Sequence, residues 1–502
     1  MAVLDSLTGA RGLRADLLAL LAGTLASLAL PPLQWLPVLL VAFPLLIGQI
    51  GAAKRARAAF RRGWWFGFGF HLVGLYWITE AILVEAARFW WLVPLAVPAL
   101  AAVLAVFIAA ASWVAWFARP GAGRILVLAG AWVAADLARQ FVATGFPWNP
   151  LGSVWAIPGL AGDVMLQPAA LGSVHGLTLA TVALACAPVL GARGRILCLG
   201  VLAGWIGFGA ARAFGPPPPG PGVTVVLVQG NVPQGQKWNR DLAVGVFERY
   251  LGLTAEGLAV AGAGPVVVVW PETASPFQLA ADRDARIAIG KVQTGAIVLA
   301  GSVRFDRDDR PRNALFALTR AGQIAAIYDK WHLVPFGEYQ PDWLRIGIQV
   351  VPGGGFARGP GPATLHVAGM PPVGVLICYE AIFPGQVIDP DDRPGWMVNV
   401  TNDAWFGTST GPRQHLAAAR LRAVEEGLPL LRAANTGITV AFDAVGHEIT
   451  RLEMEQTGFR TVALPGALPG TYFGRFGLLV PGLLTGIVLA IGLLLGRMSR
   501  YG

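Results

Sequence analysis

Two hydrophobic patterns divide this chain. Long apolar stretches, each about as long as a helix that crosses a bilayer, fill the first 214 residues, and one more lies near the C-terminus. The stretches are 14–31, 34–50, 60–82, 89–117, 123–141, 171–191, 194–213 and 476–496. The pattern therefore predicts eight membrane spans, of which the first resembles a signal sequence without a convincing cleavage site.

From Val223 to about Leu468 the apolar runs become short, β-branched and separated by turn residues. The runs are VTVVLVQ, PVVVVW, AIVLAGSV, NALFALT, PVGVLIC, WMVNVTN and GITVAFD, with helical stretches such as DLAVGVFERYLGLTAEGL and GPRQHLAAARLRAVEEG between them. Runs that are apolar throughout are typical of strands covered on both faces. The pattern predicts an α/β domain.

A proline-rich segment, GPPPPGPG at 215–222, separates the two patterns. A helix cannot continue through it, because proline lacks the N–H group and blocks the preceding turn. We therefore expect four parts: a membrane domain at 1–214 with seven spans, the linker 215–222, a soluble domain at 223–468, and a last span with a tail at 469–502.

Composition supports a membrane protein and charge orients it. Hydrophobic residues make up 55% of the chain and charged residues 13%, with a net charge of +9. Basic residues gather at alternate connections, which are retained in the cytoplasm: Arg11 and Arg14; Lys54, Arg55, Arg57, Arg61 and Arg62; Arg119 and Arg124; Arg193 and Arg195; Arg497 and Arg500. We expect both termini in the cytoplasm and the soluble domain on the other side. Topology explains the basic charge, so we expect no nucleic-acid partner.

One thiol stands out among three cysteines. Cys186 and Cys198 lie in apolar stretches, so no disulfide framework is expected. Cys378 ends the run GVLIC and is followed at once by Tyr379 and Glu380. A thiol at a sharp turn between a strand and a helix has the geometry of a nucleophile elbow, where the first N–H groups of the helix favour the thiolate.

Other polar residues follow predicted strands, where the chemistry of such folds gathers. Glu272 follows VVVVW, Asn402 follows WMVNVT, and Lys330 lies in the loop of YDKWHLVPFGEY with Glu338. A carboxylate near a thiol acts as a general base, and an ammonium stabilises the oxyanion formed on an attacked acyl carbon. Glu272 and Lys330 are the candidates for these roles.

Glu272, Lys330 and Cys378, within WPET, DKWHLVPFGEY and CYE, resemble the carbon–nitrogen hydrolase (nitrilase) superfamily. QGNVPQGQKW, GFPW at 145–148 and NDAWFG at 402–407, together with the spans, are similar to its membrane branch, the apolipoprotein N-acyltransferases of bacterial envelopes. The resemblance implies an αββα sandwich with a Glu-Lys-Cys triad on the periplasmic side of the inner membrane.

The resemblance also implies a ping-pong reaction. Cys378 would take the sn-1 acyl chain of a phospholipid, expected to be phosphatidylethanolamine, and pass it to the α-amino group of the S-diacylglyceryl cysteine of an apolipoprotein. Supporting roles fall to these residues: Glu338, Tyr379 and Glu380 in the active site, and Trp238, Asn402, Trp405 and Phe406 toward the lipid. We expect a monomer without cofactor or metal.

Three alternatives remain at this level. A tethered amidase would use the same triad with water as the acceptor, and a transporter would use the outer domain only to bind ligand. GTSTG at 407–411 matches a serine-hydrolase motif, with Ser409 as nucleophile and His415 or His447 as base, but it follows no predicted strand.

Asp136, His71 and His175 lie in apolar stretches and are candidates for a polar pathway.

Overall fold

The computed structural model describes residues 7–237, 239–293, 295–342 and 355–498. The chain divides into two compact units, Met1–Gly215 together with Tyr472–Gly502, and Pro216–Thr471. The first unit is helical and the second contains both sheets.

Helices occupy all eight stretches that the hydrophobic pattern singled out. The first unit contains α2 (Gly12–Ser27), η1 (Leu36–Val38), α3 (Leu39–Ala52), α4 (Ala56–Gly74), α5 (Ile78–Leu83), α6 (Ala86–Phe89), η2 (Trp90–Leu92), α7 (Val93–Trp116), α8 (Ala122–Phe141), η3 (Leu151–Trp155), α9 (Leu160–Met165), α10 (Ala169–Ala185), η4 (Ala187–Val189), α11 (Ala192–Ala213), α15 (Tyr472–Phe476) and α16 (Leu479–Met498).

Not all of these helices have the length and hydropathy of a membrane span. Among the described residues, Ala86–Trp116, Ala169–Val189 and Ala192–Ala213 are long and apolar enough to cross a membrane, and Leu36–Ala52 and Leu479–Leu495 are shorter apolar helices. Helices α2, α4 and α8 carry buried charged residues, namely Asp16, Arg62 and Asp136. The structure thus supports a membrane-type helical unit, while eight spans stay a prediction.

Small residues let the helices of this unit approach closely. A Cβ atom on Gly23 of α2 would lie 1.9 Å from the carbonyl oxygen of Phe66 of α4, and one on Gly67 of α4 would lie 2.9 Å from the Cα atom of Ala105 of α7. Helices in a bilayer associate through such contacts because lipid provides no hydrophobic drive between them. Glycine is required at both positions for the helices to pack as they do.

The second unit contains two six-stranded sheets, with strand orders β12-β1-β2-β3-β4-β5 and β11-β10-β9-β8-β7-β6. Its strands are β1 (Thr224–Gln229), β2 (Val266–Val269), β3 (Ile297–Phe305), β4 (Pro311–Leu318), β5 (Ile324–Asp329), β6 (Thr364–Leu365), β7 (Val373–Ile377), β8 (Trp396–Thr401), β9 (Leu430–Ala434), β10 (Thr439–Phe442), β11 (Glu448–Leu452) and β12 (Gly458–Ala463). Its helices are η5 (Gln234–Gln236), η6 (Arg240–Leu242), α12 (Ala243–Val260), α13 (Arg283–Val292), η7 (Arg320–Gly322), η8 (Cys378–Ile382), η9 (Asp403–Phe406) and α14 (Gly411–Glu426).

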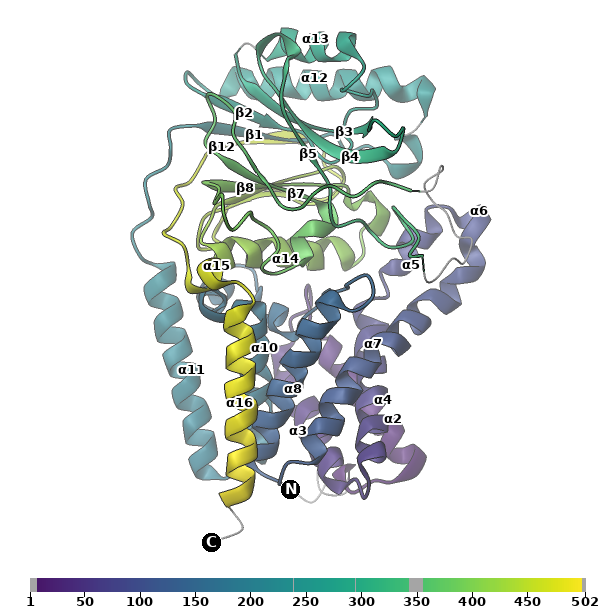
Figure 1. Ribbon diagram of the computed structural model, residues 1–502, viewed down its shortest axis with the longest axis vertical. Helices are drawn as coiled ribbons and strands as arrows, with labels where there is room; N and C mark the ends of the chain where they lie inside the picture. Colours follow the sequence, from purple (N-terminus) through teal and green to yellow (C-terminus); the bar gives the residue numbers. More distant parts are fainter. Residues whose placement is uncertain (1–6, 238, 294, 343–354, 499–502) are drawn as a thin grey trace. The chain divides into compact units, whose positions relative to one another are not determined.

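Three apolar layers hold the sheets and helices of this unit together. One cluster, which includes Leu227 of β1 and Val398 of β8, fills the space between the two sheets. A second joins the first sheet to α12 and α13, and a third joins the other sheet to α14. Figure 1 shows α12 and α13 over the first sheet and α14 under the second. The predicted αββα sandwich is confirmed.

All seven predicted strand runs are strands in the structure. The pattern missed β5, β6, β9, β11 and β12 and the helix α13. Strand β9 was missed because Arg432 interrupts its apolar run. Arg432 is fully buried there, and its charge is balanced by Asp403, whose Oδ2 lies 2.6 Å from Nη2 of Arg432.

Candidate active site

The ends of strands from both sheets bring the predicted catalytic residues together. Glu272 lies just beyond β2, and Lys330 directly follows β5, both in the first sheet. Cys378 directly follows β7 and Asn402 follows β8, both in the second sheet. Lys330 lies outside the strands, as expected, but directly after β5, a strand that the pattern missed. Lys330 is therefore held by backbone pairing, since its N–H donates to the carbonyl of Asn313 at 2.8 Å.

A buried ammonium lies between two carboxylates. Lys330 Nζ is 3.2 Å from Oε1 of Glu272 and 2.9 Å from Oε1 of Glu338. The lysine is 1% exposed. Burial by itself lowers the pKa of Lys330, but the charges of Glu272 and Glu338 outweigh burial and hold this pKa above its usual value. The lysine is therefore a permanent cation in this site.

Glu272 is fixed by donors on both of its oxygens. Oε1 also accepts from Nδ2 of Asn313 at 2.7 Å, and Oε2 accepts from the N–H of Asn402 at 2.9 Å. Burial raises the pKa of Glu272, but the positive charges of Lys330 and Lys237 and these hydrogen bonds lower it overall. Glu272 is consequently ionised at neutral pH, which a general base must be.

Cys378 lies at a strained turn. Its φ of +51° is in the left-handed region, which costs a residue with a side chain free energy and is typical of functional turns. The imidazole of His415 contacts the Cys378 carbonyl, with Nε2 3.0 Å from the oxygen. This backbone conformation turns the side chain out of the strand direction, as at a nucleophile elbow.

The predicted stabilisation of a thiolate by a following helix was wrong. The element after β7 is η8, a 3₁₀ helix of 5 residues, which is too short to provide such a field. Burial, and then the charge of Glu272, raise the pKa of Cys378, while the Lys330 ammonium and a hydrogen bond from Thr401 oppose this rise. The resting site thus combines a neutral thiol with an ionised base.

These groups fit nucleophilic attack on an acyl carbon. An ionised carboxylate beside a neutral thiol can remove its proton when the sulfur attacks, and a nearby ammonium can stabilise the oxyanion, so Glu272 and Lys330 fit these two roles. Among the described residues, no group of three histidine, cysteine or acidic side chains is placed to hold a metal ion. The described side chains therefore provide an acid–base and nucleophile set.

Comparisons with known proteins identify the family of this chain. Residues 22–187 match the model of the apolipoprotein N-acyltransferase N-terminal domain, and residues 227–462 match that of carbon-nitrogen hydrolase. The apolipoprotein N-acyltransferase of Rhodopseudomonas palustris is 39% identical over 520 residues, which cover 97% of this chain and 96% of that protein. The chain belongs to the apolipoprotein N-acyltransferase family. It is accordingly an acyltransferase.

Two further similar proteins were found. The apolipoprotein N-acyltransferase of Allorhizobium ampelinum is 40% identical over 477 residues, covering 89% of each chain. A solved carbon–nitrogen hydrolase superfamily protein from Xanthomonas campestris is 20% identical, covers 48% of this chain and 90% of its own, and has a TM-score of 0.37.

Glu380 of this family member connects the lysine loop to the nucleophile turn. It is fully buried, and its carboxylate accepts hydrogen bonds at 2.6 to 3.1 Å from the N–H groups of Ile377 and Trp331 and the hydroxyl of Tyr328, with a longer one of 3.3 Å from the N–H of His332. Its oxygens are thus occupied by protein donors next to Lys330 and Cys378. Glu380 thereby fixes the backbone next to Lys330 and Cys378, and its role in shaping the pocket stays a prediction.

Replacing Glu380 with glutamine should loosen the site and alter its response to pH. The amide nitrogen cannot accept, so at least one buried donor loses its partner, at a cost of about 1–3 kcal/mol. Burial raises the pKa of Glu380 from 4.5 to about 7. Between these values the native carboxyl binds more protons than the unfolded one, so its contribution to stability is lost as the pH rises. We expect Glu380→Gln to lower the thermal midpoint most at low pH. The midpoint of the variant should also fall less between pH 4.5 and 7 than the midpoint of the wild type does. Equal midpoint losses at all pH values would contradict the linkage.

The remaining predicted residues have mixed outcomes. Tyr379 is buried and its ring packs edge-on against Phe383, with centroids 5.2 Å apart. The side chain of Asn402 donates to Oε1 of Gln234 at 2.7 Å, so the structure shows it in a protein network, and its lipid contact stays a prediction. Trp405 is half-buried.

Two more of the lipid-side predictions complete this set. Phe406 is half-buried and lies with Trp405 in η9, with its ring centroid 6.4 Å from that of His415. Trp238 lies outside the described residues. A role of these aromatic residues toward lipid stays a prediction.

Sequence reasoning missed two polar residues at this site. Asn313 contacts both carboxylates that flank Lys330. Lys237 Nζ donates to the backbone carbonyl of Glu272 at 2.9 Å, and burial lowers its pKa to about 8. Asn313 begins the apolar run NALFALT, and Lys237 lies in the polar segment QGQKW. Such residues are usually turn residues, and the partners that give these two a role lie far away in the chain.

The serine-hydrolase alternative does not fit the structure. Ser409 Oγ donates to the carbonyl of Phe406 at 2.6 Å and lies at the start of a helix. His415 Nδ1 instead lies 2.9 Å from Asp403, and His447 Nδ1 lies 2.9 Å from Asp443. A carboxylate on Nδ1 is also found in serine triads, but there the other ring nitrogen faces the serine. In His415 that nitrogen, Nε2, lies 3.0 Å from the carbonyl oxygen of Cys378 instead.

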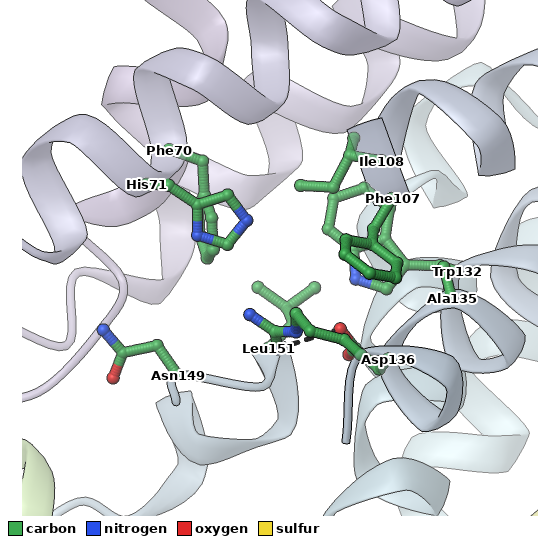
Figure 2. A pocket seen from close by; sticks show the side chains of 10 residues that line it. Phe70, His71, Phe107, Ile108, Trp132, Ala135, Asp136, Asn149 and Leu151 are labelled. Carbon is green, nitrogen blue, oxygen red and sulfur yellow. Dashed lines mark hydrogen bonds and ion pairs between the residues drawn. The ribbon is translucent and has the colours of Figure 1, made fainter. Parts of the chain in front are cut away.

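The polar residues of the helical unit form a separate site. Arg139 Nη2 lies 3.0 Å from Oδ1 of Asp136, and both line a cavity of about 10 Å³, room for about one water molecule. Figure 2 shows His71 and Asn149 at the same cavity. His175 is not among its lining residues, and a polar pathway through Asp136, His71 and His175 stays a prediction.

Breaking this ion pair should destabilise the helical unit. Arg139→Leu leaves the Asp136 carboxylate buried without its cation, at a cost of about 3–5 kcal/mol. Arg139 also donates to the carbonyl of Trp148 at 3.0 Å. We expect Arg139→Leu to have a lower thermal midpoint in detergent than the wild type. The double variant Asp136→Leu/Arg139→Leu should recover most of this loss, and the exposed control Arg195→Leu should show no loss. A double variant as unstable as the single one would show that the charge pair is not the cause.

Proposed function

We propose that this acyltransferase moves the sn-1 acyl chain of a phospholipid to the α-amino group of the diacylated N-terminal cysteine of apolipoproteins, through a thioester on Cys378. The observation that carries the proposal is the cluster of Glu272, Lys330 and Glu338 beside the strained Cys378, in a chain of the apolipoprotein N-acyltransferase family. Family membership supports the substrates, and the side chains support the mechanism.

The first half-reaction acylates the enzyme. Glu272 takes the thiol proton as the Cys378 sulfur forms a bond to the ester carbonyl carbon, and the carbonyl oxygen becomes an oxyanion facing Lys330. The bond from carbon to the sn-1 oxygen then breaks. Glu272 returns the proton to that oxygen, so a lysophospholipid leaves and a thioester remains.

The second half-reaction transfers the chain. The neutral α-amine attacks the thioester carbon, and Glu272 accepts a proton from the nitrogen. The carbon–sulfur bond breaks, the sulfur regains a proton, and an amide is formed. Both substrates are anchored in the bilayer, where each buried CH₂ contributes about 0.8 kcal/mol, so a membrane-attached enzyme avoids extracting them.

We further propose a bacterial inner-membrane location with both termini cytoplasmic and the catalytic unit on the periplasmic side. Three described helices long and apolar enough to cross a membrane support the membrane part, and the alternation of basic connections supports the orientation. We propose phosphatidylethanolamine as the donor and a monomer as the working form.

The proposal is tested by following both products. Purified protein is incubated with phosphatidylethanolamine vesicles, with and without a diacylated lipopeptide bearing a free α-amine. We expect one lysophospholipid per enzyme without the peptide, and turnover with amide formation when it is added. Accumulation of free fatty acid with no acylated peptide would instead make the protein a hydrolase that uses the same residues.

A further inference from the structure

Asn313 bridges the two carboxylates that flank the catalytic ammonium. Its Nδ2 donates to Oε1 of Glu272 at 2.7 Å and to Oε1 of Glu338 at 3.1 Å. These are the same two oxygens that Lys330 Nζ contacts at 3.2 and 2.9 Å. Two carboxylate oxygens and two nitrogen donors therefore form a closed ring.

The orientation of this amide is set by its neighbours. Turning it over would place an amide oxygen against two carboxylate oxygens, none of which can donate. Both N–H groups of Asn313 must therefore face the carboxylates. Its backbone position is fixed as well, because Asn313 lies near the start of β4 and its carbonyl accepts from the N–H of Lys330.

The amide keeps this arrangement at a cost. Asn313 is 3% exposed, and its Oδ1 is buried without a hydrogen-bond partner among the residues that the structure describes. An unpaired buried acceptor costs about 1–3 kcal/mol. Asn313 thus gives up a partner for its oxygen and keeps its N–H groups on the two carboxylates.

We propose that Asn313 is a positioning residue of the transfer reaction, which holds Glu272 and Glu338 on the one Lys330 ammonium so that Glu272 stays an ionised base. The inference rests on the proposed function of Glu272. The two carboxylates repel each other, and a single ammonium balances only one of their charges. Asn313 adds two hydrogen-bond donors without adding charge. A cation in its place would instead neutralise the base.

Other charged or titratable groups surround this ring and bear on its pH response. Lys237 donates to the backbone carbonyl of Glu272. Cys378 interacts electrostatically with both Glu272 and Lys330, and Glu380 and His332 interact with Lys330. The hydroxyl of Tyr379 interacts electrostatically with Lys330 and Glu338. These groups are unchanged when Asn313 is replaced, so a shift in the pH profile reports on the carboxylates.

The test compares Asn313→Ala and the isosteric Asn313→Asp with the wild type. Acylation of Cys378 by phosphatidylethanolamine is followed by mass spectrometry from pH 5 to 9 and normalised to protein with a native thermal transition. We expect acylation about 10²-fold slower, as for a displaced catalytic group. Without the donor that Glu272 and Glu338 share, the pKa of their carboxyl groups rises, so the acid limb of the pH profile moves to higher pH. The shift should be larger for Asn313→Asp, which adds a third carboxylate.

Gln293→Ala is the matched control. Gln293 is also a fully buried amide with an unpaired oxygen, and its Nε2 donates to the carbonyl of Thr319, beyond the other end of β4. It should lose stability with an unchanged rate and profile. If Asn313→Ala loses stability but keeps the wild-type rate and acid limb, Asn313 is structural and the inference fails. If the wild type itself forms no adduct on Cys378, the proposed function fails instead.

Discussion

Cys378→Ala is expected to abolish the acyl-enzyme completely, because no other described thiol lies near the ionised base. Of the other two cysteines, Cys186 is buried and Cys198 is partly exposed, and both lie in the helical unit. Incubation with a phospholipid followed by intact-mass measurement should show one added acyl chain on the wild type and none on the variant. The fold should survive, since alanine removes one atom at a strained turn.

Cys198→Ala is the matched control and should acylate like the wild type. Peptide mapping then locates the chain. An acyl group found on any residue other than Cys378, or a Cys378→Ala variant that still makes triacylated peptide, would overturn the assignment of the nucleophile.

Lys330→Met should slow acylation by about 10²–10³-fold, the loss typical of one oxyanion donor. The ammonium also holds two carboxylates together, so the variant leaves Glu272 and Glu338 buried without their cation. Removing one partner of a buried ion pair costs about 3–5 kcal/mol. A stability loss and a rate loss are therefore expected together.

A double variant separates these two effects. Lys330→Met/Glu338→Gln removes one excess negative charge, so it should regain much of the thermal stability while acylation stays slow. The exposed Lys291→Met on α13 controls for the loss of a lysine elsewhere in the same unit. Acylation restored along with stability would show that Lys330 acts through the fold and not on the oxyanion.

By itself the sequence determined the two bodies and most of their elements. Long apolar stretches specify helices and short β-branched runs specify buried strands, because each pattern depends only on residues that are near one another in the sequence. The order and context of Glu272, Lys330 and Cys378 likewise identified them as a set, and the structure brings Lys330 to Glu272 at 3.2 Å.

Only the tertiary structure decided how polar groups inside the catalytic unit are balanced. Asn313 acquires its role from carboxylates 41 and 25 residues away, and Arg432 is tolerated in β9 because Asp403 lies beside it. The turn at Cys378 is followed by a short 3₁₀ helix, so its thiol depends on Glu272 and Lys330 and not on a helix field. A buried polar side chain is stable only with its partners. Those partners come from loops and turns far away in the chain, which no local pattern in the sequence reveals.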